Sequence, residues 1–457
     1  MTQSTRSTRT TQHDGPRGNG GRGTAVASPA LNLRLFATHT LPVFVRGFVS
    51  PRPRVVKAYA ALNQPAWAAA TLRALRGRHG GAPVLVRGLS GPMLVLLDPK
   101  DIRQFYTEPV RSLAMDPPDK DNALKVLEPT GVICSHGELR EGRRRINDAC
   151  LAESEAVHPS GKEFRAAVAE EARRLVSQRV VDMEDIRRAM ARINRRIVLG
   201  DAAADDEELH AWLLALRNEA NWMGRRKKQA RAARAVYARA QARIESYAMK
   251  AAAHTLIARA LGQDDPQGDL DPVGQAHHWL LALDTLGPTA ARTLLLLGAH
   301  PAEQQAVVPE AASGVADMPR MRACVKETVR LFPIVPDLLR LTRAETTWRG
   351  VPVPAGTAVL VPALFHQRDP DHVPAADLFA PGRWLSPGAH EAVQLAPFSH
   401  GGGHCPGENL ALLVGAEFCA EILRTHRVTR GRPVLPSAGP LPWLLDSAAI
   451  RFGLEPR

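Results

Sequence analysis

A single cysteine, Cys405, stands in the unusual turn FSHGGGHCPGENLAL at residues 398–412. The residue that follows it, Pro406, is typical of the first position of a helix. A thiol just before a helix faces free backbone N–H groups and the positive end of the helix dipole, which favours thiolate, a strong ligand for iron. Glycine lacks a Cβ, so Gly401 and Gly407 let the backbone approach the sulfur and a flat cofactor closely. The turn therefore predicts a metal-bound thiolate.

Two alternatives for this turn stay open at the level of the residues. A cysteine in a glycine-rich turn is more often structural than metal-bound. The turn could also contribute to a zinc site, although its spacing lacks the paired ligands typical of such sites. The zinc ligands would be His400, His404, Cys405 and Cys419.

An acid and an alcohol stand side by side at Asp284 and Thr285, in the apolar segment LLALDTLGPTAARTLLLLGAHP. In an apolar helix such a pair can hydrogen-bond a bound molecule and relay protons. Pro288 has no N–H, so the carbonyl group of Asp284 loses its helical partner and we expect the helix to open there. The alternative is an aspartate that caps a broken core helix.

Two further pairs of charged residues have helical spacing. Glu327 and Arg330 lie three residues apart in KETVRLFP, on one face of a predicted helix. An exposed pair of this kind would contribute only about 0.3 kcal/mol to stability. Arg140 and Arg144 lie four residues apart in GELREGRRR, where a solvated helix face is the simplest interpretation.

The elements that would position these residues are mainly helical. Apolar residues recur at three- and four-residue spacing through most of residues 28–335. Short β-like runs occur near the start, in APVLVRG and PMLVLLD, and again late, in TTWRGVPVPAGTAVLVPALF. A Pro-rich segment leads to the glycine turn and to a last helix predicted over 406–424. We predict a single mainly α domain with a minor β component over 28–457, after a disordered Ser/Thr/Arg/Gly-rich tail at 1–27.

The composition argues against several classes of protein. The five cysteines are scattered without a CxxC pair, which argues against a disulfide framework and a Cys-rich zinc module. The start of the chain has no apolar signal-like region, and the most apolar segment contains Asp284 and Arg292, which argues against a membrane span. The net charge is +13, but the basic stretches LREGRRR and GRRKKQARAARA lack interleaved aromatic residues. Solvated helix faces and docking of an acidic partner are therefore favoured over nucleic-acid binding.

Together these motifs resemble those of the cytochrome P450 superfamily. The pattern Phe398-x-x-Gly401-x-x-x-Cys405-x-Gly407 resembles the family's haem-binding loop, in which the cysteine is the proximal iron ligand. The resemblance implies a single-domain cytochrome P450 fold, with a long distal helix and a cysteine-ligand loop, and haem b (iron protoporphyrin IX) as the cofactor. It also implies that the phenylalanine and the two glycines lie against that cofactor.

The resemblance assigns roles to residues outside the loop. Asp284 and Thr285 match the acid–alcohol pair of the distal helix, which delivers protons during oxygen activation. Glu327, Arg330 and the later Arg383, in DLFAPGRWL, match a buried charge triad that supports the cysteine loop. In such a network, loss of one partner leaves a buried charge uncompensated.

The same resemblance implies which cations hold the haem propionates. Arg144 and Arg140 occupy the positions of the family's propionate-binding helix, and Arg340, in PDLLRLTR, resembles a further propionate ligand. A guanidinium group matches the planar shape of a carboxylate. The usual basic residue two positions before the cysteine is Gly403 here, and His404 or His400 would take its place.

The function implied by the resemblance is that of a haem-dependent monooxygenase. It would insert one oxygen atom of O2 into an apolar small organic substrate, with electrons from a separate ferredoxin or flavodoxin. We expect a cytoplasmic monomer without a membrane span and without bound nucleic acid. One alternative is a peroxide-driven haem-thiolate peroxygenase, which the presence of Asp284 and Thr285 disfavours. The other is a basic nucleic-acid-binding protein whose Cys/His turn is structural or holds zinc.

Overall fold

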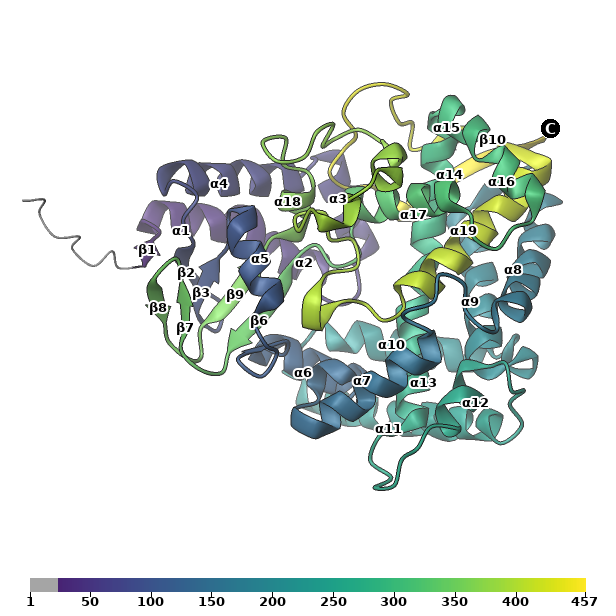
Figure 1. The fold of residues 1–457 in the computed structure, drawn as a ribbon, viewed down its shortest axis with the longest axis horizontal. Coiled ribbons are helices and arrows are strands. Elements are labelled where there is room, and N and C mark those ends of the chain that lie inside the picture. The colour runs from purple at the N-terminus through teal and green to yellow at the C-terminus, as the bar shows by residue number, and fades with distance from the viewer. Residues whose placement is uncertain (1–23) are drawn as a thin grey trace, which may run out of the picture.

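The computed structural model describes residues 24–457. Most of the predicted tail, residues 1–23, lies outside the described residues. The predicted end of that tail is wrong, because Ala25–Val26 form strand β1, which pairs in parallel with β2 (Val84–Gly88). Helices make up most of the remaining chain (Figure 1), which confirms the predicted mainly α fold with a minor β component.

The largest sheet has six strands in the order β1-β2-β3-β9-β6-β4. The two early β-like runs form the antiparallel hairpin β2–β3. The late β segment supplies β9, which is parallel to β3, and β6 pairs with β9 in the antiparallel direction. The large sheet therefore combines strands from the start of the chain with strands from its later part. The bounds of the other strands are β3 (Gly91–Val95), β4 (Leu113–Ala114), β6 (Leu338–Thr342) and β9 (Ala358–Val361).

Two small sheets lie outside this one. One has the order β10-β11-β5 and joins the end of the chain to a strand between two helices. The other is the hairpin β7–β8. The bounds are β5 (Val180–Asp182), β7 (Thr346–Trp348), β8 (Val351–Val353), β10 (His426–Arg432) and β11 (Arg451–Pro456).

The helices divide into a group beside the large sheet and a larger helical body, at the left and right of Figure 1. The group beside the sheet contains α1 (Pro29–Leu35), α2 (Leu41–Arg46), α3 (Pro53–Ala61), α4 (Pro65–Arg78), α5 (Pro99–Thr107) and α18 (Ala363–Gln367). The body contains α6 (Pro118–Leu127), α7 (Gly137–Leu151), α8 (Gly161–Val176), α9 (Met183–Leu199), α10 (Glu207–Ala220), α11 (Lys227–Ala248), α12 (Leu256–Leu261), α13 (Pro272–Leu283), α14 (Leu286–Ala299), α15 (Pro301–Ala306), α16 (Val308–Ser313), α17 (Pro319–Leu331) and α19 (Glu408–Thr425).

The apolar segment with the acid–alcohol pair forms two nearly continuous helices, α13 and α14. They are interrupted at Asp284 and Thr285, as the proline at 288 predicts. The combined helix Pro272–Ala299 is long and apolar enough to cross a membrane, but 72% of its most apolar window is buried inside the protein. That burial is typical of the central helix of a globular core.

Candidate functional site

The cysteine turn folds as a tight loop just before α19. The N–H of Cys405 donates to the carbonyl oxygen of Phe398 at 2.9 Å, and a short 3-10 turn forms at Gly401–Gly403. Gly401 has a φ of +60°, and a Cβ there would lie only 2.1 Å from the carbonyl oxygen of Tyr106. Any side chain at this position would clash with the backbone of α5. The last helix begins at Glu408, two residues later than predicted.

The surroundings of the Cys405 thiol shift its pKa in two opposite directions. Burial raises the pKa of the Cys405 thiol to about 11, although the N–H of Gly407 bonds to the sulfur and lowers it. The N–H group at the helix start lowers the pKa of the thiol in the predicted direction, but burial outweighs it because the low dielectric of a buried position disfavours the anion. A cation bound at the sulfur would supply the missing stabilisation.

Two arginines from α7 point at the backbone of this loop. Arg144 donates from Nη1 to the carbonyl oxygen of His404 at 2.7 Å and also pairs with Asp148 at 2.7 Å. Arg140 donates from Nη2 to the carbonyl oxygen of Gly402 at 2.9 Å. The Nε group of Arg140 is buried and has no partner among residues 24–457. An unsatisfied buried donor beside the loop fits an acceptor supplied by a bound molecule.

Arg340, on β6, explains the absent basic residue at Gly403. A Cβ at Gly403 would lie 2.9 Å from Nη2 of Arg340 and 3.2 Å from Cε of Met115. The space of a side chain at 403 is thus already filled by the guanidinium group of Arg340. Its Nη1 donates to the carbonyl oxygen of Phe105 at 2.6 Å, and burial lowers the pKa of Arg340 to about 10.

His404 does not join these arginines. Its Nδ1 lies 3.1 Å from Glu153 and its Nε2 lies 2.8 Å from Glu408, so both ring nitrogens are engaged. The hydrogen bond that His404 donates to the Glu408 carboxylate raises the pKa of His404. The prediction that this side chain binds the cofactor is therefore wrong, because two carboxylates hold the ring. His400 packs edge-on against Tyr106 instead.

The four predicted zinc ligands do not form a metal cluster. Both ring nitrogens of His404 are already bound, and Cys419 is fully buried in the middle of α19. The described side chains contain no group of three or more His, Cys, Asp and Glu residues that could hold a metal ion. The zinc alternative has no support in this part of the chain.

The structure brings Glu327, Arg330 and Arg383 together in a buried network. Arg330 binds both carboxylate oxygens of Glu327 at 2.8 Å, and Nε of Arg383 lies 3.2 Å from the same carboxylate. Two donors that the sequence did not suggest complete it, namely the indole Nε1–H of Trp384 at 2.9 Å and the N–H of Ala380 at 3.0 Å. Glu327 and Arg330 are completely buried. The network joins α17 to the segment that leads to the cysteine loop.

The acid and the alcohol of the interrupted helix have different surroundings. Asp284 forms an ion pair with Arg217 of α10, a partner far away in the sequence. Thr285 donates from Oγ1 to the carbonyl oxygen of Ala282 at 2.7 Å. Ala282 is exposed although the residues on both sides of it are buried. The helix therefore faces an open space at the point where it is interrupted.

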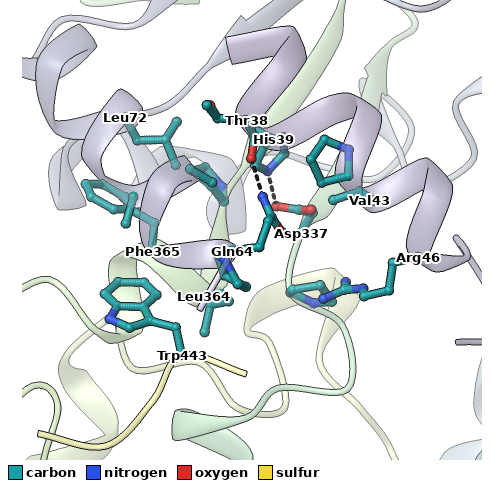
Figure 2. Close-up of a pocket in the computed structure, with 16 residues that line it drawn as sticks. Thr38, His39, Val43, Arg46, Gln64, Leu72, Asp337, Leu364, Phe365 and Trp443 are labelled. Atoms are coloured by element: carbon teal, nitrogen blue, oxygen red, sulfur yellow. Dashed lines mark hydrogen bonds and ion pairs between the residues drawn. The ribbon is translucent and has the colours of Figure 1, made fainter. Parts of the chain in front are cut away.

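A separate pocket lies between the N-terminal helices and the start of β6, away from the cysteine loop (Figure 2). Its volume of about 40 Å³ suits a few water molecules rather than an organic ligand. His39 and Asp337 form an ion pair in its wall at 3.0 Å, and Gln64 donates to the carbonyl oxygen of Thr38 at 2.6 Å. We interpret this pocket as a structural junction.

Comparisons with known proteins agree with the motifs. Residues 282–442 match the family model "Cytochrome P450". Cyclooctat-9-en-7-ol 5-monooxygenase of Streptomyces melanosporofaciens is 35% identical over 33% of this chain and 35% of its own length. Cytochrome P450 4c3 of Drosophila melanogaster is 30% identical over 32% of this chain and 30% of its own length. The match thus spans about a third of these curated relatives.

The fold has a wider match than the sequence. The structure titled "Retinoic acid bound cyanobacterial CYP120A1" aligns with 84% of this chain and 93% of its own, with a TM-score of 0.68 at 18% identity. Haem is the cofactor of cytochrome P450 proteins, and the residues around Cys405 fit it. They offer a sulfur at the loop and, beside it, an Arg140 donor without a partner among the described residues. The resemblance predicted from the motifs is confirmed, since residues 282–442 match the cytochrome P450 family model.

Proposed function

We propose that this protein is a monooxygenase that inserts one oxygen atom of O2 into an apolar small organic substrate, with electrons from a separate ferredoxin or flavodoxin. One observation carries the proposal. Arg140, Arg144 and Arg340, from two distant elements, converge on the loop that presents Cys405. This arrangement of a sulfur and several guanidinium groups matches an iron porphyrin with its carboxylates.

The residues around the loop would bind the haem. Cys405 would coordinate the iron as thiolate, and Arg140 and Arg340 would bind the propionates, since neither has a carboxylate partner among the described residues. A thiolate-bound haem supplies the activation of dioxygen. The buried Glu327 network would hold the loop in position without touching the cofactor.

The interrupted helix would supply protons. Its exposed face at Ala282 offers the Thr285 hydroxyl, and the ion pair with Arg217 holds the Asp284 carboxylate at the other side of the break. A cavity of about 10 Å³ borders Asp284 and Asn194, and the amide of Asn194 is buried without a hydrogen-bond partner among the described residues. That volume suits one water molecule. Such a water would pass protons to Asp284 and on to Thr285.

The carbon monoxide difference spectrum of the reduced protein tests this proposal. We expect the band of a thiolate-bound haem in the wild type and its loss in Cys405→Ser, because a serine oxygen does not replace the thiolate. Cys134→Ser changes a half-buried cysteine outside the loop and should keep the band. A Cys405→Ser protein with the unchanged band would contradict the proposal.

The oxidant can be tested separately. We expect turnover with a ferredoxin and its reductase, since the acid–alcohol pair would serve dioxygen activation. Turnover with hydrogen peroxide alone would instead indicate the peroxygenase. The cytoplasmic location and the monomeric state stay predictions from the sequence.

A further inference from the structure

Between Gly274 and Leu283, α13 presents only two side chains that are not buried. They are His278 and Ala282, four residues apart and therefore on one face of the helix. Ala282 marks the open space at the helix interruption. His278 consequently borders the same space, about one turn further toward the start of the helix.

The ring of His278 is fixed in this position. Its Nδ1 forms an ion pair with Glu128, whose side chain is only 6% exposed, while the His278 side chain is 26% exposed. Burial lowers the pKa of His278, but the Glu128 carboxylate outweighs this effect and the pKa is raised. The adjacent His277 bonds through Nε2 to the carbonyl oxygen of Leu127 at 2.9 Å, which holds the same two segments together.

The other ring nitrogen of His278 is available. Nε2 makes no hydrogen bond to any described residue. It is not one of the fully buried polar atoms that lack a partner, so it retains some exposure. When the imidazole is protonated, Nε2–H is a donor that points away from Glu128. His278 thus offers a positioned donor to whatever lies beside Ala282.

A second cation faces inward from α6. Lys120 has the spacing of the buried residues Ala123, Leu124 and Leu127, so its side chain lies on the inner face of the helix. Burial lowers the pKa of Lys120 to about 8, and its charged neighbours include Arg340 and Glu128. Lys120 has no ion-pair partner in the described part of the chain. Its ammonium group is therefore within electrostatic range of Arg340, Glu128 and Asp116.

The charges in this region do not balance. Lys120, Arg140 and Arg340 form no ion pair among the described residues, while Glu128 is paired with His278. Asp116, a further charged neighbour of Lys120, is paired with His136 and Arg343. A bound haem brings two propionates, which would neutralise two of the three cations. A buried charge without a counter-ion is unfavourable, so one further anion would stabilise this region.

We propose that Lys120 and the Nε2–H group of His278 bind the carboxylate of the substrate, which is an apolar carboxylic acid. This inference rests on the proposed function, because the open space must be the substrate side of a bound haem. The carboxylate would fix one end of the molecule between α6 and α13. Its apolar remainder would lie along Ala282, toward the interruption of the helix.

Binding of a matched pair of probes tests the inference. Dodecanoate and dodecan-1-ol share one chain and differ in charge, and their affinities for the ferric holoenzyme can be measured by spin-state titration and by calorimetry. We expect the wild type to prefer dodecanoate, and Lys120→Met to lower that affinity about tenfold without weakening dodecan-1-ol. His278→Gln should weaken dodecanoate in the same direction.

The control is Lys125→Met, on the exposed side of the same helix, which should leave both affinities unchanged. The haem content of each variant separates the two sources of a carboxylate. If Lys120→Met loses haem while its preference for dodecanoate persists, Lys120 serves a propionate and the inference is wrong. Equal wild-type affinities for the two probes would also overturn it. A protein without the thiolate spectrum contradicts the proposed function instead.

Discussion

Glu327 receives hydrogen bonds from four different residues. Two of these are arginines, one is Trp384, and one is a backbone N–H group. A completely buried carboxylate is stable only when its charge is compensated in this way. The side chain therefore connects α17 with the segment before the cysteine loop through charge as well as packing.

We expect Glu327→Gln to lower the free energy of unfolding by roughly 3 kcal/mol, since it leaves Arg330 buried without a counter-charge. Trp384→Phe removes one hydrogen bond and should cost only about 1 kcal/mol. Urea unfolding of both variants measures the difference. Equal effects of the two substitutions would show that the charge of Glu327 is not the main contribution.

At the scale of elements, the interruption between α13 and α14 is the feature that exposes Thr285. Pro288 cannot donate to the carbonyl group of Asp284, and Thr285 bonds to the carbonyl oxygen of Ala282 instead of continuing the helix. The side chain of Thr285 thereby reaches the open face of the helix while the helix axis continues into the core.

Pro288→Ala restores the missing N–H group and should favour a continuous helix. We then expect more of the reducing equivalents to appear as hydrogen peroxide, because the Thr285 hydroxyl is withdrawn from proton delivery. Thr285→Ala should show the same loss of coupling, and Thr285→Ser should retain product formation. The measurement is peroxide formed per reductant consumed. Unchanged coupling in Pro288→Ala would separate the helix interruption from the chemistry.

The sequence predicts those parts of the site that depend on short spacing. The loop around Cys405, the pair Glu327 and Arg330, and the helix interruption at Pro288 all follow from local patterns. Arg217, the distant partner of Asp284, could not be predicted because only the folded chain brings the two together, whereas Arg383 was expected as a partner of Glu327 only through the family resemblance. The effect of burial on the pKa of Cys405 could not be predicted for the same reason, since burial is a property of the tertiary structure.

At the scale of the whole molecule, the N-terminal helices are joined to the large sheet by an ion pair. His39 and Asp337 are only 12% and 14% exposed, and the pair closes one wall of the pocket in Figure 2. Burial lowers the pKa of His39, but Asp337 outweighs it, so the pKa is raised above 6.5. The pair therefore stabilises the fold most when the imidazole is charged.

The charged His39 stabilises the folded state fully when the pH is below the pKa that His39 has in the unfolded chain. This stabilisation decreases as the pH rises through the pKa that His39 has in the folded protein. We expect the free energy of unfolding of the wild type to decrease above about pH 6.5. His278 and His404 also have raised pKa values and contribute to this slope. His39→Gln should have a shallower slope than the wild type, measured by denaturant unfolding at several pH values. An identical slope would show that His39 is not charged in the fold.

Gly401 restricts how this protein can change over generations. Its backbone is left-handed, and a Cβ at this position would lie 2.1 Å from the carbonyl oxygen of Tyr106. No other residue type can therefore replace it. A Cβ at Gly382, in contrast, would have no atom within 4 Å, so this glycine can be replaced by other residues. Variation among descendants of this chain should therefore accumulate at one glycine and be absent at the other.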